Sequence, residues 1–204
     1  MPPVWFPFAA LAVIILMSVW RTLAVARLYN VRAFSFGKFP HIQSFAQRVW
    51  KVAVAAALAF ALLAWLAPHW SQVLGAPVWA DQPLLAWTGA TIMSLSAGLI
   101  FVAQIQMGPS WRVGVPEEGP GALVAHGLYR WSRNPIFVGM IGALVGLFLS
   151  APHIGTGALL TGTWIVAAIQ VRLEEDALRD AHGEAYERYA RIVGRWFGRR
   201  GTAS

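Results

Sequence analysis

The chain of 204 residues contains no cysteine and few charged residues. The absence of cysteine excludes disulfide bonds, thiolate metal sites and a catalytic thiol. Charged residues make up 12% of the chain, about half of their share in an ordinary soluble domain. Hydrophobic residues make up 57%, and the mean hydropathy is +0.55. This balance predicts an integral membrane protein.

Lysine and arginine are absent from whole segments. None occurs before Arg21, in residues 68–83 or in residues 150–153. The sixteen basic residues instead fall in the connection 27–51, in the loop 107–134 and in the C-terminal tail, apart from Arg21, which lies close to the first of these. Basic residues mark cytoplasmic segments, so this pattern predicts an external N-terminus and a cytoplasmic C-terminus. It also explains the net charge of +7 without a nucleic-acid partner.

Five apolar runs have the composition of membrane helices, which need about 20 residues to span a bilayer. They cover residues 5–26, 52–67, 84–103, 136–149 and 154–171. The first run lacks the charged start and the cleavage signature of a signal peptide, so we expect it to be retained. The sequence therefore predicts one all-α membrane domain over residues 1–204. Three helices lie in 1–104, and the remaining loop, helix hairpin and C-terminal helix lie in 105–204.

Three further features predict how the helices are placed relative to one another and to the membrane. The glycines Gly139, Gly142 and Gly146 recur at steps of three and four, and we expect them to pack the fourth helix against the fifth. Arg21 lies about one turn before the C-terminal end of the first helix, and we expect it to reach the lipid headgroups as a topology anchor. Beyond residue 171, apolar residues continue at helical spacing, and we expect an interruption at Gly183. This predicts an amphipathic helix at the cytoplasmic surface.

Polar residues gather just before the fourth run, in residues 126–139. Pro135 suits the first turn of a helix, where the N–H groups have no intrahelical partner. Arg133 and Asn134 therefore precede an unpaired helix N-terminus, which favours an anionic ligand. The alternative is an ordinary juxtamembrane turn whose arginines only report topology.

Glu174 and Glu175 directly follow the fifth run. Because the hairpin at 150–153 returns the chain to the same membrane face, we expect these acids to lie near Arg133. Arg133 can hold a ligand carboxylate through two hydrogen bonds, and either glutamate can accept from an ammonium or a ribose hydroxyl. The alternative is an Arg–Glu cluster that only ties the two ends of the hairpin together.

Three strings carry a resemblance to a known family: LVAHGLYRWSRNPIFVG at 123–139, RLEEDAL at 172–178, and GEAYERY at 183–189. Together they resemble the isoprenylcysteine carboxyl methyltransferase family and its bacterial, phospholipid methyltransferase-like relatives, over about the last hundred residues. The resemblance implies an integral membrane enzyme of a bacterial inner membrane that uses S-adenosylmethionine. The cofactor would bind at the cytoplasmic ends of the last helices, beneath the C-terminal segment.

The resemblance also implies a set of site residues. The cofactor-binding positions are His126, Gly127, Leu128, Tyr129, Arg133, Asn134, Pro135, Glu174 and Glu175. Of these, Arg133, Asn134 and Glu175 are the expected catalytic residues. We assign Arg133 to the methionine carboxylate, Glu175 to the ammonium or ribose, and the turn 126–129 to the nucleoside. The five histidines are scattered, so we expect no metal site.

Two positions depart from family members that act on isoprenylcysteine. This chain has Asn134 where they commonly have histidine, and Phe137 where they commonly have tyrosine. An asparagine cannot act as a general base, but a methyl group on sulfonium needs mainly alignment with its acceptor. The acceptor remains open among a lipid headgroup amine, a prenyl or quinone-like compound, and a small hydrophobic thiol or acid.

Two other functions fit part of the pattern. Sterol reductases look similar around residues 127–135, so an NADPH-dependent membrane reductase is one alternative. The pair Glu174 and Glu175 and the short chain argue against it. A membrane scaffold without turnover is the other alternative, and it predicts no cofactor binding. The sequence does not indicate an oligomeric state.

Overall fold

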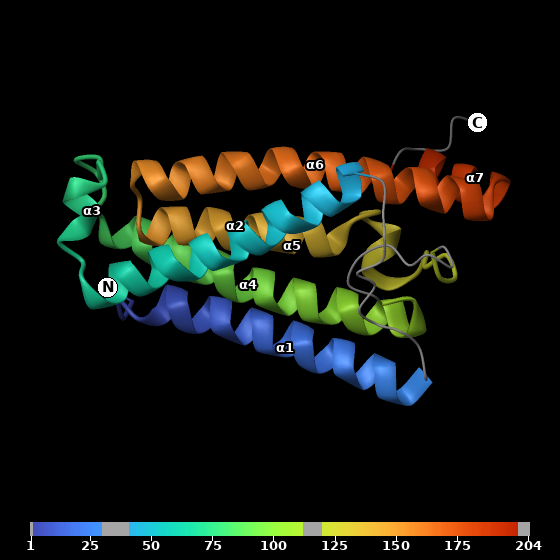
Figure 1. The fold of residues 1–204 in the computed structure, drawn as a ribbon, viewed down its shortest axis with the longest axis horizontal. Helices are drawn as coiled ribbons and strands as arrows, with labels where there is room; N and C mark the ends of the chain where they lie inside the picture. Colours follow the sequence, from blue (N-terminus) through green and yellow to red (C-terminus); the bar gives the residue numbers. More distant parts are fainter. Residues whose placement is uncertain (1, 30–40, 112–119, 200–204) are drawn as a thin grey trace.

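The computed structural model describes residues 2–29, 41–111 and 120–199, and these residues form an all-α bundle (Figure 1). Its α-helices are α1 (Phe6–Tyr29), α2 (His41–Leu66), α3 (Trp70–Val73), α4 (Pro83–Met107), α5 (Pro135–Ser150), α6 (Ile154–His182) and α7 (Glu184–Ile192). Two 3-10 turns, Gly108–Ser110 and Gly127–Arg130, lie between α4 and α5. The all-α fold class is confirmed.

Four of the described helices are long and apolar enough to cross a membrane, namely α1, most of α2, α4 and α6. The shorter α5 is also apolar, but its 16 residues extend only about 24 Å, less than the roughly 30 Å of a hydrocarbon core. The five apolar helices of the sequence are therefore present, four of them at spanning length. Their orientation in the membrane stays a prediction.

Two helices extend beyond their predicted ends. α2 begins at His41, inside the segment expected as a loop; the remainder of that connection includes residues 30–40, outside the described residues. α6 continues through the acids to His182, so the first part of the C-terminal tail prolongs the fifth helix. Gly183, with φ +49°, then breaks the helix and α7 starts. The predicted break at Gly183 is confirmed.

The glycines of α5 face α4, so their predicted packing against the following helix is wrong. A Cβ atom added at Gly146 would lie 2.6 Å from the carbonyl oxygen of Gly89 in α4, and one added at Gly89 would lie 2.6 Å from the carbonyl oxygen of Gly146. Gly139 and Gly142 face Ser96 of the same helix. Small residues on both helices allow this close approach, and α4 and α5 run side by side (Figure 1).

Arg21 is buried, so its predicted role as a headgroup anchor is also wrong. Its Nε donates to the carbonyl oxygen of Gln104 at 3.3 Å, and its Nη2 donates to the carbonyl oxygen of Gly108 at 3.3 Å. The carbonyls in the last turn of a helix have no intrahelical partner, and Arg21 of α1 satisfies that of Gln104 in α4 and also contacts the carbonyl oxygen of Gly108 just beyond the helix.

α2 crosses the bundle obliquely (Figure 1). Near its C-terminus it packs on α1, where Trp65 contacts Phe8 with ring centroids 5.7 Å apart. Its first half lies beside α5, where Trp50 contacts Phe137, and Phe60 in its second half contacts His153 at the start of α6. α1 and α2 therefore diverge toward the end of the bundle that carries α7, and this divergence positions the site described next.

Candidate functional site

The stretch from Ser132 to Pro135 is fixed by backbone and side-chain hydrogen bonds. The N–H of Asn134 donates to Ser132 Oγ at 3.0 Å, and Pro135 begins α5. The N–H of Arg133 donates to the carbonyl oxygen of Gly194 at 3.0 Å. The C-terminal turn therefore holds this stretch in place and presents the Arg133 and Asn134 side chains toward α6.

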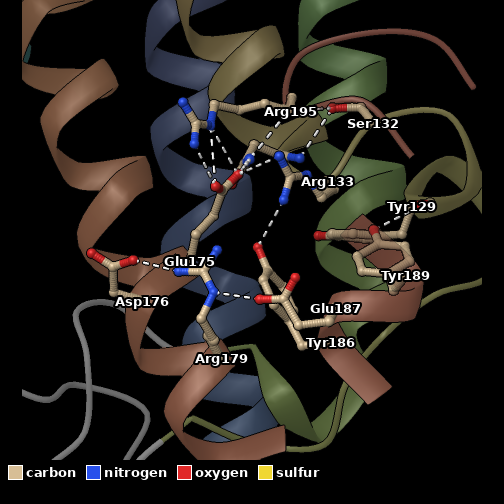
Figure 2. A network of polar contacts seen from close by, with 11 residues as sticks. Tyr129, Ser132, Arg133, Glu175, Asp176, Arg179, Tyr186, Glu187, Tyr189 and Arg195 are labelled. Atoms are coloured by element: carbon tan, nitrogen blue, oxygen red, sulfur yellow. Dashed lines mark hydrogen bonds and ion pairs between the residues drawn. The ribbon is translucent and has the colours of Figure 1, made fainter. Parts of the chain in front are cut away.

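Glu175 of α6 lies at the centre of a buried ionic cluster (Figure 2). Glu175 is only 2% exposed. Arg133 Nη2 lies 3.3 Å from Glu175 Oε1, and Asn134 Nδ2 donates to the same oxygen at 3.3 Å. Arg195 adds a bidentate pair, with Nη2 2.8 Å from Oε2 and Nε 3.1 Å from both oxygens. The predicted proximity of Arg133 and the acids is confirmed, and both carboxylate oxygens are occupied.

Arg195 is a member of the cluster that sequence reasoning missed. It lies in a turn closed by a bond from the Gly194 N–H to the carbonyl oxygen of Gly198 at 2.8 Å. Its own carbonyl oxygen accepts from Asn134 Nδ2 at 3.1 Å. The helical spacing of the tail placed this residue on a solvated face, whereas the two glycines around it were the available signal for a turn.

Two tyrosines of α7 close the cluster from the side of the tail. Arg133 Nη1 donates to the Tyr186 hydroxyl at 3.2 Å, and the Tyr189 hydroxyl donates to the carbonyl oxygen of Tyr129 at 2.7 Å (Figure 2). Burial, followed by the nearby carboxylate of Glu175, raises the pKa of Tyr186, and burial also raises the pKa of Tyr189. Both hydroxyls therefore stay protonated at neutral pH, and the Tyr186 proton is available to a ligand.

A cavity of about 790 Å³ extends from this cluster into the apolar part of the bundle. At the cluster end it is lined by polar side chains: Tyr129, Arg133, Asn134, Gln170, Glu174, Glu175, Tyr186 and Tyr189. Elsewhere its walls are mainly apolar side chains of α1, α2 and α5, among them Leu11, Ile14, Ala57, Leu58, Ile136 and Leu144. One space therefore joins a charged end to a hydrocarbon-lined arm.

Six of the nine predicted cofactor-binding residues line this cavity: Tyr129, Arg133, Asn134, Pro135, Glu174 and Glu175. The other three, His126, Gly127 and Leu128, are not among its lining residues. His126 is exposed, and Gly127 adopts φ +57° beside Gln106. The Leu128 N–H donates to Gln106 Oε1 at 2.7 Å. In this geometry Gly127 and Leu128 pack against Gln106 and position Tyr129. The predicted contact of the turn 126–129 with a nucleoside stays a prediction.

Three buried polar atoms of cavity-lining residues have no hydrogen-bond partner: Arg133 Nε, Thr163 Oγ and Gln170 Oε1. Gln170 Nε2 is occupied, since it donates to Glu174 Oε1 at 3.0 Å. Buried polar atoms are nearly always paired in native proteins, so unpaired ones on residues that line a cavity favour a polar ligand at this site. Within the described residues, no group of three or more histidines and acids could hold a metal ion.

Comparison with known proteins gives one family. A family model described as phospholipid methyltransferase matches residues 84–185, which is half of the chain. The match covers nearly all of α4 and the whole of α5 and α6, and it ends within α7, before Tyr186 and Arg195. The isoprenylcysteine carboxyl methyltransferase family, which the sequence resembles, is related to it. None of the curated proteins matches the chain at a significant level.

Proposed function

The chain belongs to the phospholipid methyltransferase family, and from this premise we propose that it methylates a lipid acceptor at the polar end of its cavity. Members of the family are integral membrane enzymes that use S-adenosylmethionine, and this protein is such a methyltransferase. Family membership therefore favours a methyltransferase over the reductase and the scaffold. The acceptor and the residue roles given below are our proposal.

The residues at the polar end of the cavity fit the chemistry of this cofactor. Its carboxylate requires a cation, and Arg133 lines the cavity with a buried Nε that has no partner. Its ammonium and ribose hydroxyls require acceptors: Gln170 Oε1 has no partner, and the Glu174 carboxylate, which accepts one bond from Gln170 Nε2, can accept more. We therefore propose that Arg133 binds the carboxylate of the cofactor, and that Gln170 and Glu174 bind its donor groups.

Glu175 takes a different role in this proposal from the one expected from the sequence. Its oxygens already accept from Arg133, Asn134 and Arg195. A carboxylate with both oxygens engaged is a poor further acceptor, but it orients the cations around it. We propose that Glu175 positions the Arg133 guanidinium and the Asn134 amide, and that Glu174 is the acidic residue that contacts the cofactor.

When bound, the cofactor would supply a methyl group on a positively charged sulfur. A lone pair of the acceptor would bond to the methyl carbon, and the sulfur would keep the electrons of the broken carbon–sulfur bond. The protein's contribution is then to hold two ligands in line and to exclude water. Asn134 cannot take a proton, so it is not the group that deprotonates the acceptor. Tyr186, whose raised pKa keeps it neutral, remains a hydrogen-bond donor at the same end.

The apolar arm of the cavity supports a lipid as the acceptor. Val19 of α1 and Val54 of α2 both line the cavity, and they are 43% and 41% exposed. The space between these two helices therefore opens toward the surroundings of the bundle, which in a membrane are lipid tails. We propose that the acceptor enters laterally between α1 and α2, with its head toward Arg133 and its chains toward Leu11 and Leu144. The observation that carries the proposal is this one cavity, polar at one end and apolar along the rest.

The test is methyl transfer by the purified protein from labelled S-adenosylmethionine to a panel of acceptors. The panel contains a phospholipid with a primary amine head, a prenylated cysteine and a quinol, each in detergent micelles. We expect labelled product from the amine lipid. Product from the prenylated cysteine alone would overturn the acceptor, while calorimetric binding of NADPH without binding of S-adenosylhomocysteine would overturn the cofactor.

A further inference from the structure

Thr163 lies on the cavity-facing side of α6, far from the ionic cluster. It is 3% exposed, and its hydroxyl has no hydrogen-bond partner. It is seven residues before Gln170 and eleven before Glu174, which places it about 10 Å and 16 Å further along the helix axis. The walls around this part of the cavity are apolar. Thr163 is therefore a residue of the cavity wall whose buried hydroxyl has no hydrogen-bond partner.

The other threonines of the described residues behave differently. Each of them donates its hydroxyl proton to a backbone carbonyl of its own segment: Thr22, Thr88, Thr91, Thr156 and Thr161. This local bond is the usual way for a threonine to satisfy its hydroxyl in a helix. Thr163 alone among them leaves the hydroxyl unpaired, in a position where water is scarce. An unpaired polar group at membrane depth is costly, so a ligand group is expected to satisfy it.

We propose that Thr163 binds an acyl ester carbonyl of the lipid acceptor, and so makes the enzyme selective for ester-linked over ether-linked lipids. This inference rests on the proposed lipid acceptor and adds the part of the lipid that is recognised. A hydroxyl donates to a carbonyl oxygen, whereas an ether oxygen is a weaker acceptor. The distance from Thr163 to Glu174 along α6 leaves room for the reacting groups and a polar head between them. An ester beneath that head would then lie opposite Thr163.

Thr163→Val separates the hydroxyl from the shape of the side chain. The parent and the variant are compared for methylation of a diacyl glycerophosphoethanolamine and of its dialkyl ether analogue with the same chain length. In the parent, we expect kcat/KM to be about three- to tenfold higher for the diacyl lipid, the value of one hydrogen bond. In Thr163→Val we expect the diacyl value to fall to that of the ether lipid, with the ether value unchanged.

Two control variants accompany the measurement. Thr161→Val removes an exposed hydroxyl of the same helix that bonds to the carbonyl oxygen of Gly157, and it should keep the parental preference. Thr163→Ser keeps a hydroxyl at the site and should restore most of the preference. Equal rates on the two lipids in the parent, or an equal loss on both in Thr163→Val, would overturn the role of Thr163 while leaving the lipid acceptor intact. If the parent methylates neither lipid, the proposed acceptor fails and this inference fails with it.

Discussion

Glu175 and Asp176 are neighbours in the chain, but they belong to ionic clusters in opposite settings (Figure 2). The Glu175 side chain is 3% exposed, and its cations lie 2.8 Å and 3.3 Å away. Asp176 and Glu187 pair with Arg179 at 2.6 Å each, yet all three of these side chains are more than 40% exposed. The exposed pairs are thus the shorter ones.

The difference shows that burial, rather than distance, decides what an ion pair does. Water competes with the partners of exposed ion pairs and dissolved ions screen their charges, so these pairs contribute little to the stability of the fold. A buried charge has already lost its water, so removing its partner leaves it without compensation. The cluster around Glu175 should therefore control folding and ligand binding, while the cluster around Arg179 should be dispensable. Four substitutions test this contrast.

Glu175→Gln should have the largest effect. It leaves Arg133 and Arg195 facing a neutral amide, and loss of one partner from a buried ion pair costs about 3–5 kcal/mol of stability. We expect a clear fall in the melting temperature in detergent and weaker binding of S-adenosylhomocysteine by the fraction that stays folded. A melting temperature equal to that of the parent would mean that the cluster around Glu175 is as dispensable as the exposed one.

Arg133→Lys should come next, acting mainly on binding. Lysine keeps the charge but loses the planar guanidinium, which can bind the cofactor carboxylate and Glu175 at the same time. A hydrogen bond to a charged group is worth about 1.5–3 kcal/mol, so affinity for S-adenosylhomocysteine should fall on the order of tenfold to a hundredfold. Calorimetry and melting temperature measured on the same samples separate this result from unfolding. Parental affinity in folded Arg133→Lys would remove Arg133 from the cofactor site.

Arg195→Ala should have an intermediate effect, because this side chain is 37% exposed. Its loss removes the bidentate partner of Glu175 but leaves the backbone bonds of the turn in place. We expect S-adenosylhomocysteine to bind severalfold more weakly, by roughly 1 kcal/mol. Arg195→Lys should recover part of the loss. A purely structural role would instead lower the melting temperature without changing the affinity of the folded protein.

Arg179→Ala should have the smallest effect, since the Arg179 guanidinium and its partners Asp176 and Glu187 are exposed. We expect melting temperature and S-adenosylhomocysteine affinity to match the parent within error, at both low and high salt. A loss comparable to that of Arg195→Ala would contradict the contrast between the two clusters, and it would show that α6 and α7 depend on this exposed link.

The sequence predicted much of the site because its parts are local. Arg133, Asn134 and Pro135 are consecutive, and the short hairpin between α5 and α6 was visible from the apolar runs on either side. Any such hairpin returns Glu174 and Glu175 to the face that carries Arg133. Arg195 could not be found in this way, because it reaches Glu175 through a turn that the helical spacing of the tail concealed.

The bundle was predictable in its elements but not in its pairings. Composition and hydropathy alone indicated an all-α membrane protein with five apolar helices, since an apolar run in lipid must satisfy its backbone within a helix. Which helix the glycines of α5 would face was decided by the fit between two surfaces. Gly146 meets Gly89 of α4 because both are small, and no pattern within α5 itself specifies that partner.

The sequence by itself determined the class of the protein, its apolar helices and the polar residues at the start of α5 and near the end of α6, because helix length, charge and capping are properties of neighbouring residues. Only the tertiary structure decided that Arg21 caps α4, that Arg195 pairs with Glu175, and that the hydroxyl of the cavity-lining Thr163 has no partner. These facts depend on residues far apart in the chain, and the same side chain can serve as a surface group or as a buried one according to what packs against it.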